Sequence, residues 1–179
     1  MSKKANLSHQ TFLPLIGFRT WEIFDGHLGS LQSDVRWPYD GILEANCSRL
    51  LKGKHLKNQA PSEDCSCGLY AFHRLKKAQE LAQFYSLDNF HDLFVPWTHI
   101  LCGVTIGWGK IMVCKYGFRS EYQRIIAFVP PIRPTKHLEQ QLASIQKNYE
   151  FPFLSSKQID IYAREFGTSY DLPIFSRFF

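Results

Sequence analysis

Three cysteines lie close together in the sequence and could bind a metal ion. Cys65 follows Cys47 by 18 positions, and Cys67 comes after a single intervening residue. Zinc takes thiolate and imidazole ligands, and a structural zinc site has four of them in a tetrahedron. His73, six residues after Cys67, and His55 are the nearest candidates for the fourth position. We therefore expect Cys47, Cys65, Cys67 and His73 to form a structural zinc site, with a spacer between Cys65 and Cys67 that is shorter than in most zinc motifs.

Two other interpretations of these cysteines stay open. In the first, Cys47 is a small buried hydrophobic residue on a strand, and Cys65 and Cys67 are ordinary loop thiols. In the second, Cys67 is a redox-active or nucleophilic thiol. A nearby helix N-terminus would lower its pKa, and His73 or His99 could act as its base.

The first half of the chain predicts strands around these cysteines. Apolar and polar residues alternate on both sides of Asp25-Gly26, which is a strong hairpin signal. Residues 42–51 predict a further strand that carries Cys47, and a polar loop follows over residues 52–64. From Leu69 to about Tyr85 apolar residues recur at three- and four-residue steps, which predicts a helix directly after the cysteine loop.

The second half predicts a long hairpin and then two helices. Residues 99–131 alternate as two strands joined by a turn. Thr135 can cap a helix. Ser155 followed by Gln158 three positions later is a capping box for a second helix, which Gly167 is expected to end.

These elements predict an α+β fold. We expect a small, strongly bent antiparallel sheet or partial barrel, one packed helix and a C-terminal helical pair. The expected organisation is a leader over residues 1–14, an α+β domain with the cysteine loop over 15–131, and a helical extension with an aromatic tail over 132–179. The tail is too apolar to remain in water, so we expect it to dock on this chain or on a protein partner.

Composition and charge indicate a folded, mildly basic protein. Hydrophobic residues make up 45% and aromatic residues 15% of the chain, enough for a packed core. No apolar run approaches the roughly 18 residues of a membrane span, and no apolar stretch follows the N-terminal lysines as in a signal peptide. We therefore expect a cytoplasmic protein. The net charge of +5 permits an acidic partner such as nucleic acid without requiring one.

Basic residues that could contact nucleic acid are densest over residues 52–57. Arg19 and Arg119 each follow a Gly-Phe pair and are expected on the outer side of their strands. Trp21 and Trp37 could stack on unpaired bases; alternatively they belong to the core and the lysines are simply solvated. The full candidate set is Arg19, Arg36, Arg49, Lys52, Lys54, Lys57, Arg119 and Arg124.

No motif of a known reaction is present. The sequence lacks a Walker-type glycine loop, HExxH, GxSxG and a dinucleotide-binding fingerprint. The spacing of the acidic residues does not single out a catalytic pair. We do not expect an enzyme, and a small enzyme with a Cys/His site stays an alternative.

Three stretches of the sequence resemble a family of small uncharacterised bacterial proteins, found in actinobacteria and cyanobacteria. The family has a GxRxW start, an AxC…AP…CxCGxYA centre and a VxLWGxVxExxxGxRAxxA hairpin. The likeness covers about residues 17–129; Gly107 and Lys115 depart from it. It implies an arrangement in which Cys47, Cys65 and Cys67 act together, and it implies no activity. The matching positions are Gly17, Arg19, Trp21, Cys47, Ala60, Pro61, Cys65, Cys67, Gly68, Tyr70, Ala71, Trp108, Gly109, Gly117 and Arg119.

Together these observations predict a non-enzymatic binding module or accessory subunit. It would contact nucleic acid or a nucleoprotein complex through the basic loop, with zinc as a possible structural cofactor. The non-enzymatic alternative is a protein-interaction adaptor that docks through its aromatic tail and binds no nucleic acid.

Overall fold

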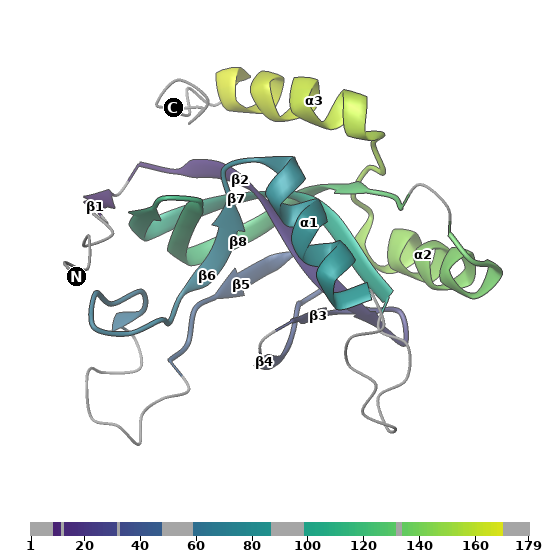
Figure 1. The fold of residues 1–179 in the computed structure, drawn as a ribbon, viewed down its shortest axis with the longest axis horizontal. Helices are drawn as coiled ribbons and strands as arrows, with labels where there is room; N and C mark the ends of the chain where they lie inside the picture. Colours follow the sequence, from purple (N-terminus) through teal and green to yellow (C-terminus); the bar gives the residue numbers. More distant parts are fainter. Residues whose placement is uncertain are drawn as a thin grey trace.

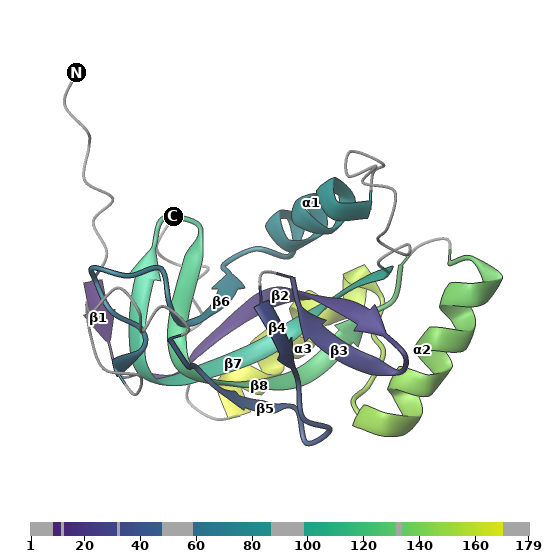
Figure 2. The ribbon, with the colours of Figure 1, turned by 90° about the horizontal axis from the view of Figure 1, so that it is seen from below.

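The structure is a computed structural model that describes residues 9–11, 13–31, 33–47, 59–86, 99–131 and 134–169 (Figures 1 and 2). In this part of the chain an eight-stranded antiparallel sheet is combined with three helices, which confirms the α+β prediction. In chain order the elements are β1 (His9–Thr11), β2 (Leu15–Phe24), β3 (His27–Ser30), β4 (Ser33–Arg36), β5 (Ile42–Glu44), β6 (Leu69–Phe72), α1 (Leu75–Ser86), β7 (His99–Cys114), β8 (Gly117–Val129), α2 (Lys136–Tyr149) and α3 (Ser156–Ser169).

The sheet bends into a partial ring. β7 and β8 form a long hairpin, and β2 pairs with the other edge of β7. β6 pairs with four residues of β8 but meets β2 only where Phe18 lies opposite Phe72. Because this last contact is a single residue pair, the four strands approach closure without forming a barrel. The predicted bent sheet is thus confirmed in its open form.

The other strands extend the ring. β3 and β4 continue the sheet beyond β2, β5 pairs with β8, and β1 pairs with the C-terminal part of β7. Asp25 and Gly26 join β2 to β3 with φ angles of 47° and 71°, as a two-residue primed turn requires. The predicted hairpin is therefore confirmed. β1 lies within the segment that we expected to be a leader, so part of that segment belongs to the sheet.

The helices cover two separate hydrophobic cores. α1 crosses β2 and β7 (Figure 1), where Leu75 and Ala78 are buried with Phe18. Ile159 and Ala163 of α3 belong to the same core. α2 covers the second core, which contains Trp21, Trp37, Leu101, Phe128, Leu138, Ile145 and Tyr149.

Both C-terminal helices begin as predicted. The Thr135 hydroxyl accepts a hydrogen bond from Leu138 N at 3.2 Å. Ser155 N donates to Gln158 Oε1 at 3.0 Å, and Gln158 N lies 3.4 Å from Ser155 Oγ, which completes the capping box. α3 runs to Ser169, beyond the expected stop at Gly167. The aromatic tail after it lies outside the described residues.

The prediction of a helix from Leu69 is wrong for its first turn. Leu69–Phe72 is strand β6, and α1 begins at Leu75. Leu69 and Ala71 are buried while Tyr70 between them is exposed, and this alternation suits a strand paired with β8. Cys47, expected on a strand, follows β5 and lies outside regular structure.

Within the described ranges, no helix combines the length and apolar character needed to cross a membrane.

Candidate metal centre

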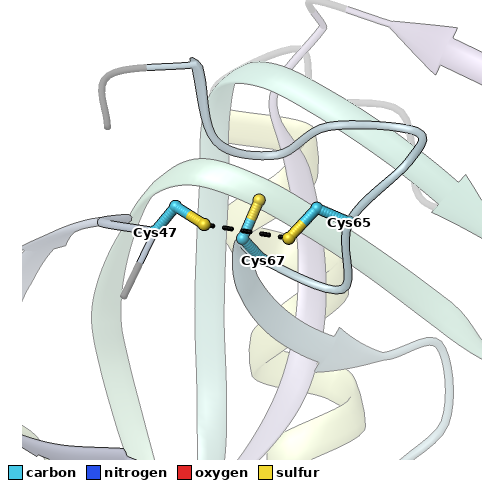
Figure 3. Close-up of side chains that lie close together, drawn as sticks. All are labelled: Cys47, Cys65 and Cys67. Carbon is cyan, nitrogen blue, oxygen red and sulfur yellow. Dashed lines mark hydrogen bonds between the residues drawn. The ribbon is translucent and has the colours of Figure 1, made fainter. Parts of the chain in front are cut away.

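The structure brings Cys47, Cys65 and Cys67 together. Their sulfur atoms all lie within 4.8 Å of one another, and the Cys47 and Cys65 sulfurs are 3.7 Å apart. Figure 3 shows the three side chains converging from two segments of the chain. Cys47 is buried, whereas Cys65 and Cys67 are partly exposed. The predicted meeting of three sequence-distant sulfurs is confirmed.

The segment that carries Cys47 is fixed to the sheet just before the cysteine. Ala45 N donates a hydrogen bond to Glu121 O on β8 at 2.6 Å. The Ala45 side chain packs in a small core with Ala60 and Leu69, from the other side of the cysteine loop. Ala45 and Leu69 are therefore close in space although 24 positions separate them in the chain, and Cys47 lies beside Cys65.

Gly68 allows the cysteine loop to pass close to β8. Its φ is +113°, a conformation that side-chain-bearing residues rarely adopt. A Cβ atom there would lie 2.9 Å from the Pro61 Cβ and 3.0 Å from the Arg119 Cβ. Glycine is therefore needed here for both backbone conformation and space.

Arg119 holds the loop from within the protein. Its side chain is buried, and Nη1 donates hydrogen bonds to the carbonyl oxygens of Ser62, Cys65 and Cys67, the last at 2.9 Å. Its guanidinium also lies 5.8 Å from the centre of the Tyr70 ring. One guanidinium group thus forms hydrogen bonds with three backbone carbonyl oxygens of the loop that carries Cys65 and Cys67.

Arg19 and Gln123 hold the end of the same segment. Arg19 Nη1 donates to Tyr70 O at 2.5 Å, and its guanidinium lies 5.1 Å from the centre of the Trp37 ring. The fully buried Gln123 donates from Nε2 to Leu69 O at 2.7 Å. Burial lowers the pKa of Arg19 to about 10, so this side chain remains charged at neutral pH.

The three sulfurs fit a thiophilic metal ion. Zinc–sulfur bonds of about 2.3 Å in a tetrahedron place ligand sulfurs about 3.8 Å apart, which agrees with the 3.7 Å between Cys47 and Cys65. Three thiolates with one Zn²⁺ carry a net charge of −1. In the described ranges neither Arg19 nor Arg119 is ion-paired with a carboxylate. An anionic metal–thiolate centre would place a negative charge on the loop whose carbonyl oxygens Arg119 binds.

The same surroundings disfavour Cys67 as a nucleophile without a metal. Burial, which is the largest cause, raises the pKa of the Cys67 thiol to about 11 together with the nearby Cys65 and Cys47, although a backbone hydrogen bond with Ser62 acts to lower it. A neutral thiol is a poor nucleophile. The sulfur spacing suits a metal ion, and the raised pKa of Cys67 argues against an activated nucleophile.

The assignment of His73 as a metal ligand is corrected by the structure. Its Nε2–H donates to the carbonyl oxygen of Cys114 at 3.0 Å, and its ring lies beside Phe118. In the described ranges the group of possible metal ligands consists of the three cysteines alone. His55 falls outside those ranges.

The predicted nucleic-acid contacts divide into three groups. Arg19 and Arg119 donate hydrogen bonds from their guanidinium groups to backbone carbonyl oxygens of the cysteine segment. Arg36 and Arg124 are exposed, as expected. The remaining predicted contacts lie outside the described residues: Arg49, Lys52, Lys54 and Lys57.

Trp21 and Trp37 are not available for stacking on bases. Both are buried, and their rings meet edge to face with 5.6 Å between centroids. The alternative that they belong to the core is confirmed. The aromatic character of a residue does not predict its exposure, so the sequence alone left this open.

Gln123 and Gly68 help to position this centre, and neither was among the predicted site residues. A glutamine within the apolar sequence of β8 could have indicated a structural role for Gln123, because a buried amide must find hydrogen-bond partners. The glycine directly after Cys67 was a second signal, since glycine often marks a left-handed conformation.

Comparisons with protein-family models, curated proteins and solved structures found no significant match. The resemblance to the uncharacterised bacterial family therefore stays a prediction.

Proposed function

We propose that this protein is a non-enzymatic binding module in which a metal–thiolate centre anchors a basic segment that contacts nucleic acid. The segment comprises residues 48–58 and is called the basic excursion below. It begins directly after Cys47 and ends at Asn58, shortly before the cysteine loop. The excursion contains four basic residues and no acidic ones: Arg49, Lys52, Lys54 and Lys57 are its charged members.

The convergence of the three sulfurs carries this proposal. Cys47 directly precedes the excursion and Cys65 lies after its end, yet their sulfurs are 3.7 Å apart. A metal bound to both would join the two ends of the excursion. Fixing the ends of a segment reduces the conformational entropy that it loses when it binds a partner.

Charge supports nucleic acid as the partner. Positive side chains that contact phosphates release condensed counterions, so binding weakens steeply with salt. Arg36 and Arg124 are exposed and add basic groups outside the excursion.

Salt-dependent binding of a labelled oligonucleotide tests the proposal. We expect the metal-loaded protein to bind with a dissociation constant that rises with salt concentration. Replacing Lys52, Lys54 and Lys57 with glutamine should reduce the slope of log K against log salt by about 2 for a single strand.

A matched control carries the same change of charge elsewhere. Lys136 and Lys147 lie on α2 and Lys157 on α3, and all three are exposed. Their replacement with glutamine should leave the slope nearly unchanged. Equal losses in the two triple variants, or no salt-dependent binding, would contradict the proposal and favour the adaptor without nucleic acid.

A further inference from the structure

An exposed tyrosine lies at the turn between β7 and β8. The side chain of Tyr116 is 57% exposed. Its backbone is held in place, because His73 N, just before α1, donates to Tyr116 O at 3.0 Å. The ring is therefore presented to solvent from a fixed backbone position.

Two lysines flank this ring. Lys115 Nζ lies 5.0 Å and Lys77 Nζ 6.0 Å from the ring centre. Glu80 forms an ion pair with Lys77 at 2.6 Å. Arg74 and Lys76, three residues and one residue before Lys77, are also exposed. Two ammonium groups thus lie at this ring, and one of them is paired with a carboxylate.

We propose that Tyr116, Lys77 and Lys115, called the tyrosine platform below, bind an unpaired base of a single-stranded nucleic acid. The base would stack on Tyr116, and the two ammonium groups would contact the adjoining phosphates. This inference depends on the proposed function. It adds a second contact with the nucleic acid and a preference for single strands over duplexes. Aromatic platforms bind single strands since a paired base cannot offer its face to a side chain.

The platform is connected to the metal centre through β6 and β8. Tyr70 lies opposite Arg119 and Phe72 opposite Gly117, so Tyr116 is the next residue along the same ladder. Tyr70 is 44% exposed and lies 5.8 Å from the Arg119 guanidinium, which is bonded to the cysteine loop. Three strand residues span about 10 Å. The platform therefore lies about 10 Å along β8 from the arginine that binds the cysteine loop.

Fluorescence anisotropy with a labelled 20-nucleotide single strand and its duplex tests the inference. Replacement of Tyr116 with alanine should weaken single-strand binding about tenfold and change duplex binding less than twofold. Tyr116→Phe keeps the ring and should bind like the unmodified protein. Lys115→Glu should also weaken single-strand binding. Lys157→Glu makes the same charge change on α3 and serves as its control.

The outcomes separate this inference from the proposed function. If Tyr116→Ala binds single strands normally while the excursion triple variant loses affinity, the platform is overturned and the proposed function stands. If Tyr116→Ala weakens the binding of the single strand and of the duplex equally, base stacking on Tyr116 is overturned. If the unmodified protein shows no salt-dependent binding to either probe, both proposals fail.

Discussion

Arg19 and Arg119 donate hydrogen bonds to a single segment, Arg19 to the carbonyl oxygen of Tyr70 and Arg119 to that of Cys67. Each arginine follows a Gly-Phe pair, one on β2 and one on β8. Two strands far apart in the sequence thus position the loop that carries two of the three clustered sulfurs. This arrangement leads to three predictions about the metal centre and its support, and His73 leads to a fourth about acid stability.

The first prediction concerns metal content. Protein purified without a polyhistidine tag should contain close to one zinc ion per chain by elemental analysis, because three thiols already lie at ligand spacing. Cys47→Ser should lose the metal. Cys114→Ser removes a partly buried thiol outside the cluster and should keep it. A full metal content in Cys47→Ser would show that the cluster is not the site.

The second prediction concerns Arg119. Replacement with methionine leaves carbonyl groups of Ser62, Cys65 and Cys67 without their donor, and should lower the free energy of unfolding by about 3 kcal/mol. Urea unfolding measures this. The exposed Arg124 is the control, and Arg124→Met should change stability by less than about 0.5 kcal/mol. Equal stability of the two variants would refute the supporting role of Arg119.

The third prediction concerns Gly68. Its φ of +113° and the nearby Pro61 and Arg119 Cβ atoms leave no room for a side chain. Gly68→Ala should cost about 3 kcal/mol in thermal or urea unfolding and weaken metal binding. Gly29→Ala is the matched control, because its Cβ would have its nearest neighbour at 3.8 Å. A harmless Gly68→Ala would mean that the loop adopts another path.

The fourth prediction concerns acid stability. Burial lowers the pKa of His73; the Arg74 charge acts in the same direction, and the hydrogen bond to Cys114 opposes them. The unfolded state, with a pKa near the usual 6.5, takes up a proton before the folded state does. The stabilising contribution is therefore complete above about pH 6.5 and is lost as the pH falls below it.

Urea unfolding between pH 7.5 and about 5, with chelator present so that metal release does not contribute, measures this effect. His73→Gln keeps a donor for the Cys114 carbonyl and should flatten the curve of unfolding free energy against pH. Parallel curves for the two proteins would rule out His73 as a source of acid sensitivity.

The sequence by itself determined the local structure where a short pattern has one physical solution. Asp25-Gly26 predicted its hairpin because both residues tolerate positive φ. Thr135 and the Ser155–Gln158 pair predicted two helix starts, since capping depends on neighbours in the chain. Residue spacing and chemistry also predicted that Cys47, Cys65 and Cys67 would meet.

The tertiary structure alone decided which side chains face inward. Arg119, Trp21 and Trp37 have residue types that occur both at surfaces and in interiors, and only the assembly of the sheet and its covering helices buries them. The tertiary structure also made Leu69–Phe72 a strand. These residues pair with β8, and this pairing outweighed the helical preference of the local sequence. Local preferences amount to tenths of a kcal/mol per residue, whereas burial and strand pairing involve residues that are distant in sequence.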